Sequence, residues 1–428
     1  MACRFGSSSA NLLGVCEEGG FVNIFRTGEE QQRELLTPVR RWLAHRDAIF
    51  DICWTMEDRR LLSGSGDYHI CYWDTETMGL LATFRGHSGS VRSLRFHDCD
   101  YNVFASAGRD GNVLLWDVRV PERSNDFGVA VKASVMTLQG AHALRKAGGE
   151  GERGPSGAKS VTGLLFALGD TILVSSGADG RIKFWDVRKV SHLNPAGVRS
   201  EPKHVLAFDV RADSPAAGAA VPGRPASRPH GITCIALSPA GNRLAAYSLD
   251  NHIYEYDFYA PEDAAAVRRF DAPVSSFYAR AAYAPSGRHI AAGSSSAHVA
   301  VYDVRAADAA TAAGAEPLAR LEGHAQSVLA VDWSPMDNQI ASCSDDGTTR
   351  LWTVQPSRPQ VKRRRLQPDD GDGSQPPVPP TPVPAPAAAA AANAQDAIAN
   401  ARAVATAAAG PPARRGPVQL SITSFFTT

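Results

Sequence analysis

The chain has 428 residues, enough to bury a large core as two or three ordinary domains or as one large repeat fold. Lys and Arg number 44, as do Asp and Glu, so a net charge of zero argues against a histone-like or polybasic nucleic-acid binder. No apolar run reaches 18 residues, which excludes a transmembrane helix. The seven Cys are scattered without a Cys-x-x-Cys pair, and residues 1–9 lack a secretory signal. We therefore expect a soluble intracellular protein without membrane contact, disulfide framework or zinc cluster.

A sequence pattern recurs through residues 1–354. Its clearest copy contains Gly86-His87, then Gly108-Arg109-Asp110-Gly111, then Trp116-Asp117. Each copy ends near an aromatic residue, and these are Phe25, Trp73, Trp116, Trp185, Tyr256, Tyr302 and Trp352. They lie 43 to 50 residues apart, except for two gaps of 69 and 71 residues. Five copies also carry a His and, six residues before the aromatic residue, an Asp: His45 and Asp67, His87 and Asp110, His142 and Asp179, His230 and Asp250, His324 and Asp346. One structural unit is thus repeated seven times.

Short runs within each copy alternate between apolar and polar residues, as in residues 91–96 and 113–116. Such alternation between Gly, Asp and Ser turns predicts β-strands. A period in the mid-forties with Gly-His and Trp-Asp marks resembles the WD40 repeat, in which four strands form one propeller blade. Seven copies predict an all-β, seven-bladed WD40 propeller over residues 1–354, closed into a ring without free sheet edges. We expect His, Asp, a Ser such as Ser106 and Trp to share a hydrogen-bond network in each blade.

Two insertions interrupt the repeat, at about residues 121–160 and 190–229. Both are rich in Gly, Ala, Pro and Arg, so we expect surface loops there. They are either functional or padding without a function of its own.

Enzyme signatures are missing from the sequence, which has no phosphate-binding loop, no His-Glu-x-x-His and no Gly-x-Ser-x-Gly. The repeat itself accounts for regular residues such as His87 and Asp110 as structural groups. The sequence therefore predicts a non-catalytic protein that has no catalytic residues, metal site or cofactor.

A Trp-Asp-x-Arg motif closes two consecutive copies. The two motifs contain Trp116, Asp117 and Arg119 and, one blade later, Trp185, Asp186 and Arg188, with a weaker third copy at Tyr302, Asp303 and Arg305. Each motif lies where the third strand of a blade ends, so the Arg side chains should project from one rim of the ring. They either solubilise a turn or form planar, multi-donor anchors at a protein interface, and the recurrence in adjacent blades favours an interface.

Residues 355–428 differ in composition from the repeat. They hold 13 of the 28 Pro, a long Ala tract, eight basic residues and four acidic ones. Such a segment cannot offset its ordering entropy by burial, so we expect a disordered tail. Within it, Lys362, Arg363, Arg364 and Arg365 indicate nuclear import or direct contact with nucleic acid, the alternative being a charged linker.

The tail closes with Gln419, Ile422, Phe425 and Phe426. Ile422, Phe425 and Phe426 share one face of a single helical turn, and exposed aromatic residues on a disordered segment are costly unless they dock. This Gln-x-x-Ile-x-x-Phe-Phe run resembles the PIP box, the peptide that docks replication proteins on the sliding clamp PCNA. Clamp-coupled degrons add Thr-Asp before the aromatic pair and a basic residue after it, and this sequence has neither. We interpret the run as a docking peptide.

Together these features resemble the denticleless family, the WD40 substrate receptors of the cullin-four RING ubiquitin ligase. The resemblance is most specific in residues 42–45, 91–96 and 108–113, and the insertion after the third blade also occurs in that family.

The resemblance implies a nuclear substrate receptor that delivers clamp-bound proteins for ubiquitin-dependent degradation in DNA replication, the cell cycle and the DNA damage response. It places Trp116, Asp117, Arg119, Trp185, Asp186 and Arg188 at the interface with the triple-propeller damaged-DNA-binding adaptor of the ligase. The other face of the ring would bind the degron of a substrate such as a replication-licensing factor, and residues 419–426 would hold the receptor on PCNA. The rival interpretation is a nuclear WD40 scaffold or chromatin-assembly factor recruited to PCNA without a ubiquitin ligase.

Overall fold

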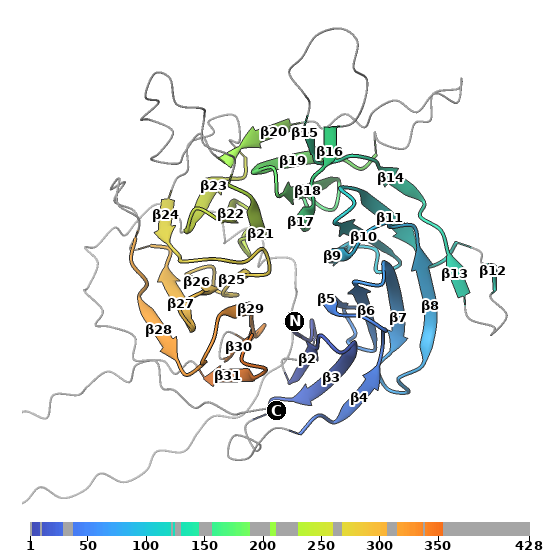
Figure 1. Cartoon of the computed structure of the whole chain (residues 1–428), viewed down its shortest axis with the longest axis horizontal. Coiled ribbons are helices and arrows are strands. Elements are labelled where there is room, and N and C mark those ends of the chain that lie inside the picture. The colour runs from blue at the N-terminus through green and yellow to red at the C-terminus, as the bar shows by residue number, and fades with distance from the viewer. Residues whose placement is uncertain are drawn as a thin grey trace, which may run out of the picture. The chain divides into compact units, whose positions relative to one another are not determined.

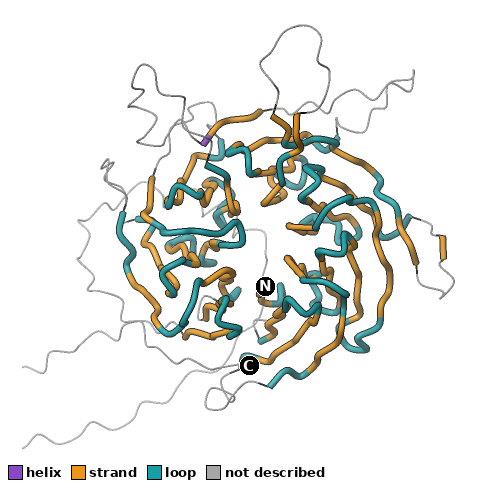
Figure 2. The backbone as a smooth tube through the Cα atoms, in the orientation of Figure 1, coloured by secondary structure: helices purple, strands orange, loops and turns teal. Residues whose placement is uncertain are grey.

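The structure is a computed structural model that describes residues 2–8, 11–28, 37–120, 123–124, 130–144, 156–188, 206–210, 230–259, 268–305, 315–336 and 339–353. Its strands form seven blades around a central channel, and the first strand of each blade is innermost (Figure 1 and Figure 2). The all-β, seven-bladed propeller is therefore confirmed. The described part contains no helix with the length and apolar character needed to span a bilayer. The predicted tail, residues 355–428, lies outside the described residues.

Each blade is an antiparallel sheet whose strands follow one another in chain order. The innermost strands of blades 1 to 7 are β1 (Ala2–Phe5), β5 (Ile49–Trp54), β9 (Val91–Phe96), β17 (Val161–Ala167), β21 (Ile232–Leu237), β25 (Ala281–Tyr283) and β29 (Val328–Trp333). The second strands are β2 (Leu12–Cys16), β6 (Arg60–Ser65), β10 (Val103–Gly108), β18 (Ile172–Gly177), β22 (Arg243–Ser248), β26 (His289–Gly293) and β30 (Gln339–Ser344).

The outer half of each blade follows the same order. The third strands are β3 (Phe21–Arg26), β7 (His69–Asp74), β11 (Val113–Asp117), β19 (Arg181–Asp186), β23 (His252–Asp257), β27 (His298–Asp303) and β31 (Thr349–Thr353). The outer strands of blades 1 to 6 are β4 (Arg40–Leu43), β8 (Leu80–Arg85), β14 (Met136–Leu138), β20 (Leu206–Asp209), β24 (Arg268–Asp271) and β28 (Ala319–Glu322). Three strands are described for blade 7.

The two faces of the ring carry different turns. The first and third strands of a blade both pair antiparallel with the second, so they begin on one face and end on the other. We call these the start face and the end face. The turn between the second and third strands lies on the start face, and the turns after the first and third strands lie on the end face.

A buried hydrogen-bond network fixes four of the blades. In blade 3, His87 Nδ1 lies 2.9 Å from Asp110 Oδ2, and His87 Nε2 lies 2.7 Å from Ser106 Oγ. The indole of Trp116 donates to the same Ser106 oxygen at 2.8 Å. Equivalent contacts join His45, Asp67, Ser63 and Trp73; His142, Asp179, Ser175 and Trp185; and His324, Asp346, Ser342 and Trp352. The expected network is confirmed in these blades.

Blade 5 departs from this expectation. His230 is exposed, and Ala246 takes the position that Ser106 holds in blade 3, so the network cannot form. Asp250 instead accepts a hydrogen bond of 2.6 Å from the hydroxyl of Tyr254. The prediction that His230 and Asp250 form a copy of the network was therefore wrong.

The two insertions contain strands of the propeller, which corrects the expectation of surface loops. In the first, β14 is the outer strand of blade 3, and β13 (Ala130–Lys132) pairs in parallel with β8 of blade 2. The remaining strands of this insertion form short hairpins: β12 (Arg123–Ser124) with β13, and β15 (Ala143–Leu144) with β16 (Ser156–Ala158). In the second insertion, β20 is the outer strand of blade 4. The expectation of loops failed because each blade needs a fourth strand. This outer strand carries none of the marker residues of the repeat, so the sequence pattern does not reveal it.

Side chains close the ring between blades 1 and 7. The amide of Phe5 in β1 donates to Asp332 Oδ2 in β29 at 2.7 Å, and Gln339 Nε2 donates to the carbonyl of Thr27 at 3.0 Å. A shared core covers this junction, made of Cys3, Phe5, Leu13, Val15, Phe25, Ala330, Ala341, Cys343 and Leu351. Because β1 pairs with β2 and β29 pairs with β30, the strand pairing of β1 and β29 lies within their own blades. Packing and these hydrogen bonds therefore hold the junction between the two blades.

Candidate functional site

The Trp-Asp-x-Arg motif of blade 3 presents one Arg side chain to solvent. Trp116 is fully buried, and its hydrogen bond to Ser106 anchors the end of β11. The next residue, Asp117, accepts from the amide of Arg119 at 2.8 Å, which closes a tight turn on the end face. The motif therefore has an inner half that fixes the strand and an outer half that displays Arg119.

Arg119 is held in one orientation by two carboxylates. Its guanidinium donates to Asp117 at 2.8 and 2.9 Å and to Asp100 at 2.9 Å, while 57% of the side chain stays exposed. The hydrogen bond to Asp117 raises the pKa of Arg119, so the group is charged at every physiological pH. A planar cation that is already oriented loses little freedom when it docks into a partner.

Blade 4 repeats this arrangement with small differences. The amide of Arg188 donates to Asp186 at 3.1 Å, its guanidinium lies 3.2 Å from the same carboxylate, and 70% of the side chain is exposed. The weaker third copy, at Arg305, keeps the amide bond to Asp303 at 2.8 Å. The structure thus displays Arg119 and Arg188 on one face of two adjacent blades.

The structure buries the two Trp residues and Asp186 of the motifs, which corrects the prediction that they contact a partner directly. Trp116 and Trp185 have 0% and 1% of their surface exposed, and Asp186 has 5%. These side chains cannot touch a partner without unfolding the blade, so they position Arg119 and Arg188 structurally. Of the six residues assigned to an adaptor interface, the two Arg and the half-buried Asp117 are accessible.

Lys132 supports the turn that carries Arg119. It is buried in β13, and its ammonium group donates to the carbonyls of Val118 and Val120, the latter at 3.2 Å. A buried ammonium needs such acceptors, so the first insertion is fastened to the motif of blade 3. Sequence reasoning missed Lys132 because it lies inside a segment assigned to a surface loop.

Exposed apolar side chains lie beside Arg119 on the end face. Asp100, which binds Arg119, is followed by Tyr101, whose hydroxyl donates to the sulfur of Met56 at 2.8 Å. Met56 is 52% exposed, and the matching turns of blades 4 and 7 expose Leu168 by 50% and Met336 by 69%. Aromatic and Met side chains around an Arg are typical of protein interfaces. In the sequence, these exposed side chains could have been found as apolar residues that lie within predicted turns.

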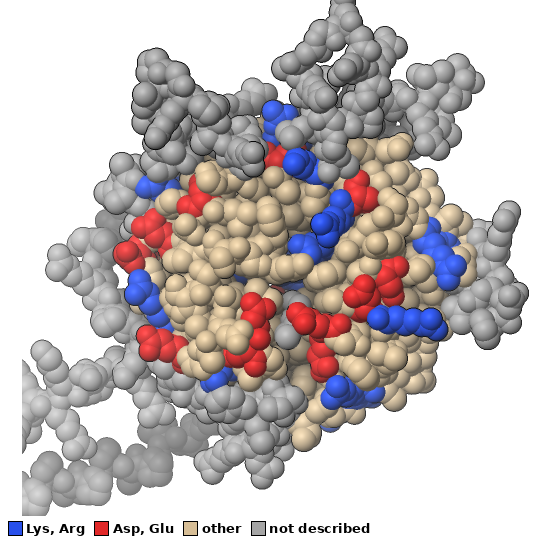
Figure 3. Space-filling view, in the orientation of Figure 1, with Lys and Arg blue, Asp and Glu red and all other residues tan. Residues whose placement is uncertain are grey.

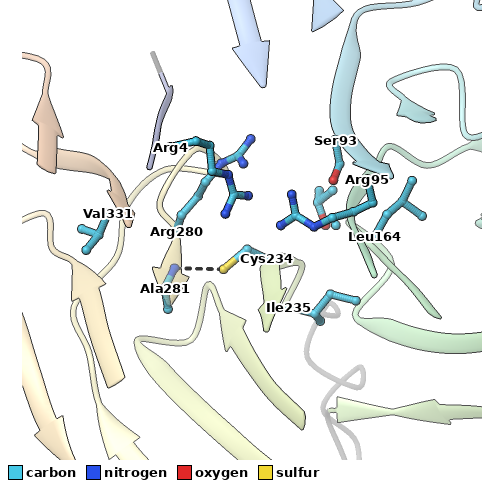
Figure 4. A pocket seen from close by; sticks show the side chains of 11 residues that line it. Arg4, Ser93, Arg95, Leu164, Cys234, Ile235, Arg280, Ala281 and Val331 are labelled. Atoms are coloured by element: carbon cyan, nitrogen blue, oxygen red, sulfur yellow. Dashed lines mark hydrogen bonds between the residues drawn. The ribbon is translucent and has the colours of Figure 1, made fainter. Parts of the chain in front are cut away.

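The channel wall carries a charged cluster centred on the buried Asp51. Arg280 Nη1 lies 2.7 Å from Asp51, while Arg4 and Arg95 lie 3.9 Å away on either side. Figure 4 shows the three guanidinium groups converging on the centre of the ring. Burial alone would raise the pKa of Asp51, but Arg280 and the other two cations lower it. The cavity that these Arg line holds about 20 Å³, room for about one water molecule.

The remaining predicted residues stay untested by the structure. Lys362, Arg363, Arg364 and Arg365, and the docking peptide with Gln419, Ile422, Phe425 and Phe426, lie outside the described residues.

Comparison with known proteins agrees with the propeller. The family described as WD domain, G-beta repeat matches residues 36–74, 78–117, 153–186, 225–257 and 315–353. The chain is therefore a WD40 propeller protein whose end face displays paired Arg side chains.

Curated relatives narrow this class. The chain is 31% identical over 380 residues to the denticleless protein homolog of Danio rerio, covering 85% of this chain and 53% of that protein. It is 27% identical over 367 residues to the human denticleless protein homolog (82% and 46%) and 28% identical over 368 residues to lethal(2)denticleless of Drosophila melanogaster (81% and 43%). The chain belongs to the denticleless family, and it spans about half the length of these relatives.

Proposed function

We propose that this protein is a non-catalytic substrate receptor of a cullin-four RING ubiquitin ligase that works on the PCNA clamp in the nucleus. The observation that carries the proposal is the pair Arg119 and Arg188, held by carboxylates on one face of adjacent blades beside the exposed Met56 and the half-buried Tyr101. Membership in the denticleless family supports it. The end face is the surface that docks the triple-propeller adaptor.

The geometry suits an anchor more than a reacting group. Each guanidinium is planar, exposed and rich in donors, which suits a partner's carboxylate or carbonyl, and docking removes Met56 and Tyr101 from water. Fixed Asp partners limit the entropy lost on binding.

The tail supplies the second contact. Residues 419–426 dock on PCNA, and the basic run 362–365 directs the chain to the nucleus. A receptor tethered to the clamp meets a clamp-bound degron at a high effective concentration, so a weak degron is captured without tight intrinsic binding. The consequence is ubiquitylation of replication and cell-cycle proteins while they are on PCNA.

Substitution of both Arg tests the adaptor contact. Arg119→Ala with Arg188→Ala should reduce co-purification of the adaptor at least about tenfold, because interface Arg anchors often contribute more than 1 kcal/mol each. Thermal stability should change little, since both side chains are exposed surface groups. Arg320→Ala, a 54% exposed Arg on β28, is the matched control. Unchanged adaptor recovery with clamp binding retained would refute the ligase role and favour the nuclear scaffold.

Substitution of the aromatic pair tests the clamp contact. Phe425→Ala with Phe426→Ala should weaken binding to purified PCNA by about a hundredfold, since two aromatic anchors are lost. Calorimetry on the full chain measures this. Thr427→Ala with Thr428→Ala serves as the control, and equal affinity of the aromatic variant and the control would contradict a docking peptide.

A further inference from the structure

The opening of the channel on the start face is lined by a stack of two aromatic rings and a guanidinium. Phe50 of β5 and Tyr278 stack with ring centroids 5.6 Å apart and planes inclined by 16°. The guanidinium carbon of Arg92 in β9 lies 4.2 Å from the centroid of Tyr278 and 4.9 Å from that of Phe50. The neighbouring Phe277 is 37% exposed and Tyr278 is 41% exposed. Large aromatic surfaces therefore meet solvent around a stacked cation.

A segment from blade 6 builds this stack by reaching across the ring. Tyr278 and Arg280 belong to the connection between β24 and β25, which extends towards the centre (Figure 1). Arg280 donates to the carbonyls of Phe50 and Arg92 at 2.8 and 3.3 Å as well as to Asp51. The anchor fixes the stack in place, so the surface is formed before any ligand arrives.

Two cations, Arg92 and Arg109, lie at this opening on the side of blade 3. Arg109 is exposed in the turn between β10 and β11, and its amide donates at 2.8 Å to the carbonyl of Ser90, next to β9. Within the described ranges, no carboxylate lies within 4.0 Å of the guanidinium of Arg92 or Arg109, in contrast to Arg4, Arg95 and Arg280. Burial lowers the pKa of Arg92, a hydrogen bond to Tyr278 opposes this shift in part, and repulsion from Arg280 and Arg109 adds to it. An added anion would relieve this repulsion.

The other side of the opening carries the opposite charge. Glu18, in the turn between β2 and β3, and Asp345, in the turn between β30 and β31, are both exposed. Burial raises the pKa of Asp345, and the negative charges of Glu18 and Asp346 raise it further. Figure 3 shows basic side chains beside the centre on the side of blades 3 and 4, and acidic ones on the side of blades 1, 2 and 7.

We propose that this opening binds an extended peptide with an acidic residue on Arg92 and Arg109 and, several residues away, a basic residue on Glu18 and Asp345. Phe277 and Tyr278 would cover apolar side chains between them. The divided charge favours such a peptide over a nucleic acid, because a continuous polyanion would be repelled by Glu18 and Asp345. The claim that this site reads the substrates of the ligase rests on the proposed function. The claim that the opening binds a peptide does not depend on that function.

Selection from a random ten-residue peptide library, displayed on phage, tests the site. The full chain is the target, and the Arg92→Gln, Arg109→Gln double variant is used for counter-selection. Enriched peptides should carry Asp or Glu at a constant distance from Lys or Arg. Fluorescence anisotropy of the best peptide should give a Kd at least about tenfold higher for the double variant, since charge-assisted hydrogen bonds are lost. Arg320→Gln on β28 is the matched control and should leave the Kd unchanged.

A charge exchange makes the test specific. Glu18→Lys with Asp345→Lys should reject the selected peptide and accept one in which Glu replaces its basic residue. Thermal unfolding checks that every variant folds. Enrichment without acidic residues, equal binding by the Arg92, Arg109 variant, or binding of a duplex DNA oligonucleotide in place of peptides would overturn the proposal.

The two proposals fail separately because they concern opposite faces. If adaptor recovery depends on Arg119 and Arg188 but the peptide selection fails, only the peptide site is refuted. If peptides bind but the adaptor is not recovered, the ligase role is refuted and the peptide site is retained.

Discussion

Burial and the neighbouring side chains decide how the His of a blade titrates. The position two before the closing Trp is Cys71 in blade 2 and Arg350 in blade 7. Burial lowers the pKa of His45, but hydrogen bonds to Asp67 and Cys71 outweigh burial and raise it to about 9. In blade 7, burial outweighs the bond to Asp346, and nearby Arg350 adds repulsion, so the pKa of His324 is lowered. Identical networks thus hold their His in different charge states.

These shifts predict opposite titrations in one molecule. NMR of the imidazole resonances should show that His45 is still protonated at pH 8 and that the midpoint of the His324 titration lies below pH 6.5. Arg350→Cys should raise the pKa of His324, because removing a nearby cation favours the charged ring. An unchanged pKa of His324 in this variant would mean that burial and the bond to Asp346 set its value without Arg350.

The same shifts fix the sign of their stability contributions. His45, whose pKa is raised from 6.5, adds stability that is complete below pH 6.5 and is lost as the pH rises through about 9. The contribution is at most roughly 3 kcal/mol. His324, whose pKa is lowered, loses its contribution as the pH falls below 6.5. Unfolding of His45→Gln at pH 6 and pH 9.5 should therefore show the larger loss, relative to the unaltered chain, at pH 6.

At the scale of the strand, the first insertion controls the turn that carries Arg119. Lys132→Met removes the ammonium group that binds the carbonyls of Val118 and Val120. Loss of a charged hydrogen bond costs about 1.5–3 kcal/mol, so amide exchange at Arg119 and Val120 should accelerate about tenfold or more. Hydrogen-exchange mass spectrometry measures this. The equivalent amide of Arg188 in blade 4 is the internal control, and equal exchange at Arg119 before and after the substitution would contradict a supporting role for Lys132.

The strands that the sequence predicted and those that it missed differ in one respect. Third strands such as β11 and β19 end near Trp116 and Trp185, which are buried and hydrogen-bonded, so each leaves a marker in the sequence. Outer strands such as β14 and β20 have no such marker and lie in segments rich in Gly, Ala and Pro. For the same reason, sequence reasoning found Arg119 beside Trp116 but missed Lys132 and the stack of Phe50, Arg92 and Tyr278.

At the scale of the whole ring, Asp51 joins side chains from blades 1, 2, 3 and 6. Asp51→Asn keeps the shape of the side chain but leaves Arg4, Arg95 and Arg280 facing one another without their shared anion. Breaking a buried ion pair from one side costs about 3–5 kcal/mol, so denaturant unfolding should show a loss of that size. Asp257→Asn, which removes an exposed pair with Arg243, should cost less than about 1 kcal/mol. Equal losses in the two variants would show that the cluster does not hold the blades together.

The contacts across the ring could not be read from the sequence, because no local spacing relates their partners. Arg280 meets Asp51 across 229 positions, and Gln339 meets Thr27 across 312. The repeat predicts how many blades there are and where each begins. Which charged side chain faces which across the channel depends on the closed ring.

The junction between blades 1 and 7 has a consequence for synthesis of the protein. The amide of Phe5 donates to the carboxylate of Asp332, 327 positions further along the chain, and Cys3 packs against residues of the propeller's last strands to be translated. Until the ribosome has released those strands, β1 keeps an apolar side that no partner covers, which is a hazard for aggregation. The slowest step of folding is then expected to be this late closure, and a chaperone that shields the nascent amino-terminal strand would have its greatest effect here.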